Sequence, residues 1–510
     1  MSVYDKSIVA SGHSLVSEAA AIVLEEGGNA FDAVVAAGFA AAVAEPALTS
    51  LGGGGLMLGY SSERGQAAFF DFFVDTPGRG LQKKGGQPDF FPLVVDFSGS
   101  SQIFNIGLGS VAVPGVLKGL LHIHKRLGYM GLADVIHPAR ELALGHLLNN
   151  QQAHFLHLLY PIMTLTGRGR RLYEAGGQYI EEGDTLVNSD AADFFEQLCL
   201  EGDESFYRGE IARKIGEEMR DGGGLLTADD LAAFKVLERD PLSVPYRNYQ
   251  FLTSPDPSMG GTLIGLALCL SAGGAAPDYK WGSGEYLLSS VALMKEVERL
   301  RSAGITSPAS LKTFLADGLA VASSRENMRL FSRGTTHISV ADAAGNCAGM
   351  TCSNGEGSGY FAPGTGIMLN NMMGEDDLHP DGFHAAEPGE RVFSMMSPSL
   401  LMQDGLVELV IGSGGSKRIR TAISQVLMQV TDFNRTLQEA VDAPRLYLDG
   451  DCLQLEPGFS EQAVESVRRV VQVNLWDRKD VYFGGVHAVI PGVGGAGDNR
   501  RGGSVVSVLK

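Results

Sequence analysis

The sequence predicts an α+β fold whose first two-thirds are mainly helical and whose last third is rich in strands. Helical patterns of apolar residues recur between glycine and proline punctuation across residues 17–44, 113–143 and 211–234. After Gly334, short strand-like runs are instead separated by Asp-Gly and Ala-Gly turns. The composition, 44% hydrophobic and 19% charged, is that of a packed globular protein.

The first of these segments is predicted to form two packed helices. A Gly27-Gly28-Asn29 break separates them, and the second consists almost entirely of small apolar residues, as a fully buried helix does. Glu45-Pro46 ends it, and the run Gly52-Gly53-Gly54-Gly55 leads into a strand over residues 56–60. These glycines do not fit a nucleotide loop, because such a loop follows a strand and opens a helix.

The chain changes character near Gly334. Residues 61–105 are predicted to be turn-rich and irregular, and residues 301–333 are the best candidate for an exposed segment, where cleavage is tolerated. Strands are expected beyond this point at residues 337–341, 347–353, 400–402 and 406–411. The composition therefore divides the chain into residues 1–334 and 335–510.

The net charge of −19 argues against nucleic acid and anionic membrane surfaces as partners, because both are repelled by it. The longest apolar run, residues 33–44, is shorter than the ~20 residues that span a bilayer. The N-terminus lacks the apolar core of a signal peptide. Five widely spread cysteines without metal-ligand spacing favour free thiols. We expect a cytoplasmic protein that needs no cofactor or metal.

The first candidate for chemistry is the stretch Gly334-Thr335-Thr336-His337. It opens a predicted hairpin whose second strand ends at Ser353, so the hairpin would bring Ser353 back towards Thr335. A threonine hydroxyl is a poor nucleophile, but its own freed α-amino group, which titrates near ~8, can serve as the base. The alternative is a half-buried hairpin with hydroxyls on its wet face, and these residues alone favour it.

The second candidate is the glycine loop Ile411-Gly412-Ser413-Gly414-Gly415-Ser416, which follows a predicted strand and precedes a helical pattern. Gly414 and Gly415 would let two backbone N–H groups point at a developing oxyanion, each worth about 3 kcal/mol. A phosphate cradle does not fit, because neither the Walker spacing nor the dinucleotide fingerprint is present. A plain glycine turn at the start of a helix remains the alternative.

The remaining polar candidates are acidic residues and histidines. They are Asp75, Glu356, Glu375, Asp376, Asp377, His379 and His384. A metal site is one interpretation, yet no recognised ligand spacing supports it. A solvated loop is therefore favoured, and no metal is expected.

An ordered series of further motifs runs nearly from end to end of the chain. It consists of Gly27-Gly28-Asn29-Ala30-Phe31-Asp32-Ala33, Glu45-Pro46, Gly52-Gly53-Gly54-Gly55, Val113-Pro114-Gly115, Phe206-Tyr207-Arg208-Gly209, Gly223-Gly224-Leu225-Leu226-Thr227, Pro257-Ser258-Met259-Gly260-Gly261 and Ala443-Pro444-Arg445. Together with the Thr-Thr-His stretch, the series resembles the gamma-glutamyltranspeptidase family of N-terminal-nucleophile hydrolases. A series of this length in this order is very specific.

The resemblance implies a proenzyme that cuts itself between Gly334 and Thr335, so that Thr335 becomes the nucleophile. It assigns Ser353 to the hydroxyl that assists cleavage and orients the nucleophile, and Gly414 and Gly415 to the oxyanion hole. It also implies a four-layer αββα sandwich in which the two fragments form one intertwined domain. The partners implied are a small-molecule amide and, as acceptor, water or an amine.

The sequence departs from the family pattern in the substrate pocket. Phe73 stands where the family has the arginine that clamps the substrate carboxylate, so a bidentate contact is lost. Glu375 replaces the aspartate that receives the substrate amino group, Asn354 matches the substrate-binding asparagine, and Ser394-Met395 replaces two serines. The cations that could compensate for the lost arginine are Arg79, Lys417 and Arg418.

The main function predicted is a self-processing threonine amidohydrolase or acyltransferase that cleaves a gamma-glutamyl amide such as glutathione. Because of Phe73, an amidase with a less polar acyl pocket, similar to the cephalosporin and glutaryl acylases, is the alternative. A non-catalytic, uncleaved binding protein is the alternative of another class. A homo-oligomer is left open.

Overall fold

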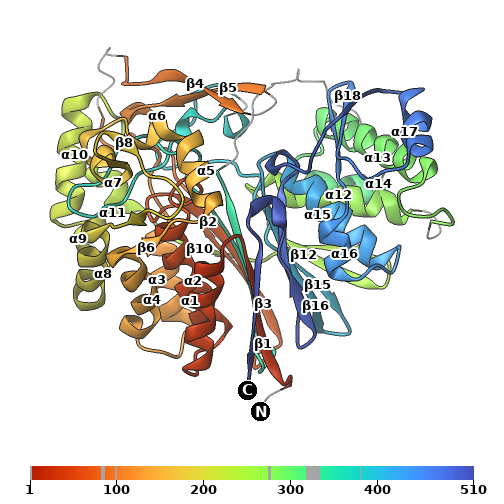
Figure 1. Cartoon of the computed structure of the whole chain (residues 1–510), viewed down its shortest axis with the longest axis horizontal. Helices are drawn as coiled ribbons and strands as arrows, with labels where there is room; N and C mark the ends of the chain where they lie inside the picture. The colour runs from red at the N-terminus through yellow and green to blue at the C-terminus, as the bar shows by residue number, and fades with distance from the viewer. Residues whose placement is uncertain (1–2, 82–86, 98–99, 274–276, 318–333, 380) are drawn as a thin grey trace.

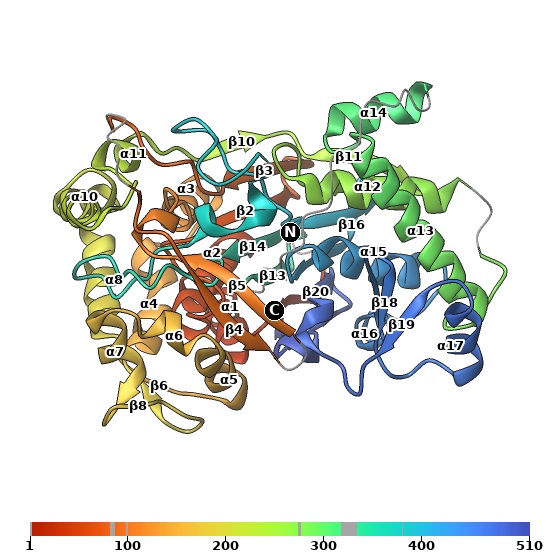
Figure 2. The same ribbon diagram turned by 90° about the horizontal axis from the view of Figure 1, so that it is seen from above.

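The computed structural model describes residues 3–81, 87–97, 100–273, 277–317, 334–379 and 381–510. Two β-sheets lie face to face in the middle of the molecule, and helices pack against each of them (Figure 1). The view from above separates the helices of one side from those of the other (Figure 2). The N- and C-termini lie together because the first and last strands pair with each other.

The first sheet has the strand order β10-β3-β2-β14-β13-β1-β22, and its neighbouring strands are antiparallel. Its strands are β10 (Leu237–Arg239), β3 (Gln66–Phe72), β2 (Gly54–Ser61), β14 (Cys347–Ser353), β13 (Thr336–Ala341), β1 (Lys6–Ser11) and β22 (Ser504–Leu509). The central hairpin β13–β14 is thus flanked on both sides by other strands, and all of its residues are buried.

The second sheet, also antiparallel, has the order β11-β12-β15-β16-β20-β21. Its strands are β11 (Leu242–Tyr246), β12 (Tyr249–Thr253), β15 (Ser399–Gln403), β16 (Leu406–Gly414), β20 (Gly485–Ile490) and β21 (Gly494–Ala496). The sheets approach closely where the His337 ring covers Gly412: a Cβ on Gly412 would lie 2.2 Å from the ring. The glycine therefore permits the hairpin to lie directly on β16.

Helices pack on both sheets. Those on the side of the first sheet are α1 (Ser14–Glu25), α2 (Ala30–Ala44), α3 (Val116–Leu127), α4 (Leu132–Leu144) and α8 (Ser189–Glu201). Those on the side of the second are α12 (Met259–Ala272), α13 (Gly284–Ser302), α15 (Arg418–Thr431) and α16 (Leu437–Asp442). The other main helices are α5 (Asn150–Leu158), α6 (Tyr160–Met163), α7 (Gly167–Tyr173), α9 (Glu204–Tyr207), α10 (Glu210–Gly222), α11 (Ala228–Ala233), α14 (Pro308–Asp317) and α17 (Glu461–Arg468).

Most sequence predictions of these elements are confirmed, including the two N-terminal helices, the helices near residues 116–144 and 210–233, and the four strands after Gly334. The prediction of an irregular segment over residues 61–105 is wrong, because it contains β3, β4 (Phe91–Phe97) and β5 (Ser100–Ile106). The inner end of β3 is buried on both faces, so it lacks the polar alternation that marks a half-exposed strand. Of the predicted exposed segment, residues 318–333 lie outside the described residues.

The prediction that the first two-thirds are mainly helical needs refinement. Both sheets take strands from both sides of Gly334. Strand β1, from the start of the chain, lies between β13 and β22 from its second part. Neither part of the chain could therefore complete a sheet without the other.

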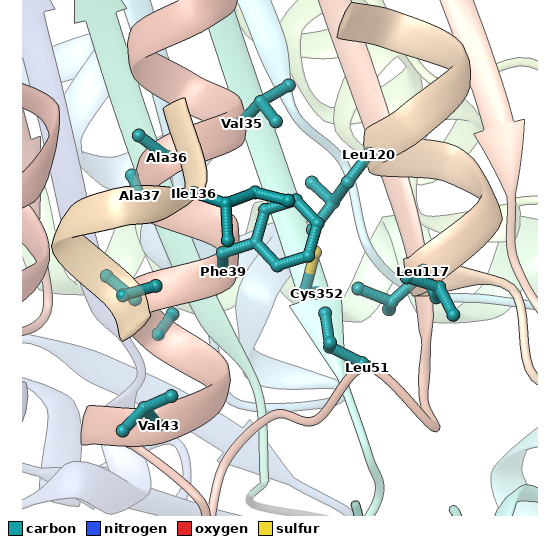
Figure 3. Packing of buried hydrophobic residues seen from close by; sticks show 14 of the residues in the cluster. Val35, Ala36, Ala37, Phe39, Val43, Leu51, Leu117, Leu120, Ile136 and Cys352 are labelled. Carbon is teal, nitrogen blue, oxygen red and sulfur yellow. The ribbon is translucent and has the colours of Figure 1, made fainter. Parts of the chain in front are cut away.

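Helix α2 forms the centre of the core on the side of the first sheet. It begins with a capping box between Asn29 and Asp32, and nearly all of its residues are buried, as expected of a helix that is apolar all round. Phe39 on α2 packs edge-on against Phe195, with ring centroids 5.6 Å apart. Figure 3 shows Phe39 surrounded by the side chains of Leu117, Leu120 and Ile136.

Among the residues that the structure describes, none of the helices has both the length and the hydrophobicity that a membrane crossing requires. The five cysteines are free thiols, two of them fully buried.

We expect Phe39→Ala to lower the free energy of unfolding by about 3–5 kcal/mol, because it leaves a cavity among side chains that already fill the core. The midpoint of urea unfolding, followed by fluorescence, measures the effect. Leu200→Ala, at a side chain that is 81% exposed on α8, is the control. A shift for Phe39→Ala no larger than that of the control would contradict the close packing around Phe39.

Candidate active site

The hairpin β13–β14 brings together the residues of the first predicted constellation. Its register places Thr335 beside Ser353, and Thr335 Oγ1 donates a hydrogen bond to Ser353 Oγ (3.3 Å). Ser353 Oγ in turn donates to the carbonyl oxygen of Gly334, and it accepts from the N–H of Gly355 (3.1 Å). Thr335 and Ser353 are both buried, so this chain of hydrogen bonds is shielded from solvent.

This arrangement is suited to cutting the peptide bond between Gly334 and Thr335. The hydrogen bond from Ser353 polarises the carbonyl that an attacking oxygen must reach. Attack by Thr335 Oγ on the carbonyl carbon of Gly334, followed by expulsion of the Thr335 nitrogen, converts the amide into an ester. Hydrolysis of that ester leaves a carboxylate on Gly334 and a free amine on Thr335.

The predicted oxyanion loop lies directly against the nucleophile. A Cβ on Gly414 would lie only 2.3 Å from the carbonyl oxygen of Thr335, so no larger residue fits without a shift. Gly415 has a φ of +120°, which side-chain-bearing residues rarely adopt. Gly414 pairs with Gly485, which fixes the loop to β20. The structure thus brings the second predicted constellation to the first.

Two charged residues at the nucleophile were not assigned roles from the sequence. Arg501 Nη1 donates to the carbonyl oxygen of Thr335 (3.0 Å), and Glu45 Oε2 accepts from Thr336 Oγ1 (3.0 Å). Burial raises the pKa of Glu45 to about 7, although Thr336 and Arg501 favour its ionised form. The Glu45-Pro46 motif is the sequence signal for Glu45, whereas no sequence motif pointed to Arg501.

A buried network of ion pairs lies behind the glycine loop. Arg445 pairs with Asp498 (2.5 Å), and Arg500 pairs with Asp498 (3.1 Å) and with Glu456. Burial opposes the ionised form of Asp498, but the charges of Arg445 and Arg500 outweigh it and hold the pKa of this carboxyl below its ordinary value. Arg445 also donates to the carbonyl of Gly484, immediately before β20 (3.2 Å). The network therefore anchors the support of the oxyanion loop.

Phe73, which the family resemblance aligns with the substrate-clamping arginine, belongs to an apolar cluster. Its side chain is 2% exposed, and a Cβ on Gly54 would lie 2.8 Å from its ring. Gly54 lies on β2 and pairs with Ser353, so the ring packs on the strand next to the hairpin. Other members of the same cluster are Met372, Met373, Leu378, Val392 and Met396.

Arg391, beside Phe73, and two of the candidate replacement cations contact other groups. Arg391 donates to the carbonyl of Phe73 and pairs with Asp75 (2.9 Å) and Asp71 (3.3 Å). Burial raises the pKa of Asp75 to about 6, against the opposing charge of Arg391. Of the candidate replacements, Arg418 is buried and donates to the carbonyl of Tyr482 (2.9 Å), and the guanidinium of Arg79 lies against Gly389.

Asn354 and Glu375 lie at the turn after Ser353. Asn354 is fully buried, and within the described part of the chain neither its Oδ1 nor its Nδ2 has a hydrogen-bond partner. Glu375 Oε1 lies 2.2 Å from the position that a Cβ on Gly355 would take. Buried polar groups normally find partners, so an unpaired amide beside the nucleophile is suited to holding a substrate.

Within the described residues, Ser394 and Met395 are not members of the hydrogen-bond chain from Thr335 through Ser353 to Gly334. Ser394 Oγ accepts from the N–H of Met396 (3.1 Å), which ties it to its own loop. Met395 lines a groove of about 1370 Å³ between α12, α13 and α15. Lys417, the third candidate for the lost arginine, lines the same groove.

The two histidines considered as metal ligands each face a backbone carbonyl. His379 Nε2 lies 2.8 Å from the carbonyl oxygen of Met372, and His384 Nε2 lies 2.9 Å from that of Gly109. No group of three histidine, cysteine or carboxylate side chains is placed to hold a metal ion within the part of the chain described.

Comparison with known proteins points to one enzyme family. The family model for gamma-glutamyltranspeptidase matches residues 16–508. The chain is 30% identical to the glutathione hydrolase proenzyme of Escherichia coli (strain K12), covering 90% of this chain and 84% of that protein. It is also 30% identical to the Acylase ACY 1 proenzyme of Pseudomonas sp. (strain V22), covering 91% and 86%.

Solved structures share the fold of this chain. The cephalosporin acylase from Bacillus halodurans superposes with a TM-score of 0.82 at 24% identity, covering 99% of this chain and 96% of that one. A Helicobacter pylori gamma-glutamyltranspeptidase chain gives a TM-score of 0.51 at 26% identity, covering 62% and 93%. From the extent of the family match and the two 30% identical relatives, we conclude that the chain belongs to the gamma-glutamyltranspeptidase family of enzymes.

Proposed function

We propose that the chain cuts itself between Gly334 and Thr335 and then acts as a threonine amidohydrolase or acyltransferase. The observation that carries this proposal is the buried chain of hydrogen bonds from Thr335 through Ser353 to the Gly334 carbonyl. The proenzyme names of the relatives agree with it.

In the cut enzyme, the free amine of Thr335 takes the proton from its own Oγ, which attacks the substrate amide carbon. The N–H groups of Gly414 and Gly415 receive the developing oxyanion, and Ser353 orients the nucleophile. The amine part of the substrate leaves with that proton, and the acyl group stays on Thr335 Oγ. Water or a second amine then takes the acyl group from the enzyme. The close approach of the glycine loop to Thr335 on the hairpin supports these roles.

We also propose that the architecture is a four-layer αββα sandwich built by both fragments. Helices α2 and α3 pack against strands of the first sheet, and α15 and α12 against strands of the second, which supports this layering. The sharing of both sheets by residues 1–334 and 335–510 would hold the fragments together after cutting.

For the acyl group, a gamma-glutamyl amide such as glutathione is the first candidate, since relatives are named glutathione hydrolases. Phe73 and its apolar cluster favour a second candidate, an acyl group without an α-carboxylate. Asn354 and Glu375 would still receive an amino group, because one is a buried unpaired amide and the other a carboxylate.

Thr335→Ala should abolish cutting, because the variant has no hydroxyl to attack Gly334. Mass spectrometry of the purified protein should find one chain of 510 residues instead of fragments 1–334 and 335–510. Thr262→Ala removes another buried threonine hydroxyl, on α12, and serves as the control that is still cut. A wild-type chain that stays intact on long incubation would instead favour a non-catalytic binding protein.

Ser353→Ala should slow cutting by about a hundredfold, the usual effect of losing one donor to a developing oxyanion. The half-time of fragment appearance after a short expression pulse measures this rate. Ser399→Ala is the matched control, because Ser399 is equally buried in β15 but bonds to Thr253 and Ser397. Equal half-times for the two variants would remove Ser353 from the reaction.

Four acyl anilides separate the two candidate acyl groups: gamma-glutamyl, 4-aminobutanoyl without the α-carboxylate, glutaryl without the amino group, and butanoyl without both. We expect loss of the carboxylate to change kcat/KM less than threefold, since no clamp is present. Loss of the amino group should lower it by about tenfold or more, the worth of a charged hydrogen bond. A tenfold preference for gamma-glutamyl over 4-aminobutanoyl would contradict the missing clamp, whereas Phe73→Arg should create that preference.

A further inference from the structure

We infer that Arg501 keeps the freed amino group of Thr335 in its neutral, proton-accepting form. The inference rests on the proposed function, because only the cut chain has this amino group. Arg501 would act through Thr335 without touching the bonds that change, so it is a positioning residue for the catalytic base.

The guanidinium of Arg501 lies where Thr335 and the glycine loop meet. Its Nη1 donates to the carbonyl oxygen of Thr335 (3.0 Å) and lies 3.2 Å from the position of a Cβ on Gly414. The carbonyl oxygen and amino nitrogen of one residue are only about 3 Å apart. The charge of Arg501 therefore lies within the ~4–6 Å over which a like charge disfavours an ammonium group.

The fold prevents this charge from moving away. Arg501 ends the short helix η5 (Asn499–Arg501), in which the neighbouring Arg500 is locked to Glu456 and Asp498. Its side chain passes close to Gly485, where a Cβ would lie 2.4 Å from Arg501 Cδ. Arg501 itself is 2% exposed, so water screens its charge little.

Burial lowers the pKa of Arg501 to about 10, so the guanidinium stays protonated at neutral pH. A free α-amine has a pKa near ~8 and would be mostly protonated, and so unable to accept a proton, at pH 7. A buried cation beside it shifts that equilibrium towards the neutral amine. This is the form in which Thr335 can activate its own hydroxyl.

Three carboxylates around Thr335 oppose this effect. Glu45 accepts a hydrogen bond from Thr336 Oγ1 (3.0 Å), and Glu356 accepts one from the N–H of Gly334 (3.4 Å). Glu375 Oε1 lies against Gly355, in the turn after Ser353. Burial raises the pKa of Glu45 to about 7, so this carboxyl is largely neutral below pH 7 and opposes Arg501 mainly at higher pH.

The imidazoles of the site carry no charge at neutral pH. Burial lowers the pKa of His337 well below its ordinary value and that of His487 to about 4. The other ionisable side chains on elements packed around Thr335 are His13, Lys417, Arg418, Arg445, Glu456, Asp480, Asp498 and Arg500. Arg501 differs in that it donates directly to the carbonyl oxygen of Thr335.

The test is the pH dependence of kcat/KM for an acyl anilide, measured on the processed wild type, Arg501→Gln and Arg501→Lys. The glutamine variant should move the acid limb up by about one pH unit, so that kcat/KM below the limb falls about tenfold while the high-pH plateau changes little. The lysine variant keeps a charge and should stay within about 0.3 unit of the wild type. Glu45→Gln removes an opposing charge and should move the limb down.

Arg213→Gln, on the exposed face of α10, is the control for loss of a positive charge and should leave the limb in place. An unmoved limb in Arg501→Gln would overturn the inference. An Arg501→Gln chain that stays uncut would also overturn it, because Arg501 acts on the amino group only after the chain has been cut. A wild type that is never cut, or that hydrolyses no acyl anilide, contradicts the proposed function instead.

Discussion

The hydrogen bond that Ser353 donates to the Gly334 carbonyl is the interaction on which the rest of the site depends. It exists because the hairpin β13–β14 is buried between neighbouring strands and under the second sheet. Buried hydroxyls need partners within the protein, so Thr335 and Ser353 take defined positions where water would otherwise compete. The nucleophile, its helper and the bond to be cut are therefore oriented before any chemistry begins.

The same burial explains the cluster of charges behind the glycine loop. Removing ions from water is costly, and such a network seldom adds net stability over apolar packing. Its members Arg445, Glu456, Asp498 and Arg500 instead connect the start of β20 with helix η5. Both ends of this connection meet at Thr335: β20 supports Gly414, and η5 carries Arg501. The network thus fixes two groups that face one carbonyl.

The site combines a complete set of candidate reacting groups with an altered pocket. Thr335 is hydrogen-bonded to Ser353, and Gly414 lies against the Thr335 carbonyl, which supports the roles proposed for these residues. On the side where the family resemblance places a guanidinium, Phe73 belongs to a cluster rich in methionine, and Arg391 is neutralised by Asp71 and Asp75. A pocket can lose a charged clamp in this way without disturbing the hairpin, because Phe73 lies one strand away from it. Reaction type and acyl preference are therefore separable in this fold.

The sequence by itself determined the strands and helices with strong local patterns, such as β14 and α2, and its ordered motifs identified Thr335, Ser353, Gly414 and Gly415 as one set. It missed β3, whose two-sided burial removes the alternation that reveals a strand. Only the tertiary structure decided that β1 separates β13 from β22, and that Glu45 and Arg501 meet at residues 335 and 336. The reason is physical: periodicity records which face of an element is buried, whereas contacts between residues hundreds of positions apart arise only when the sheets assemble.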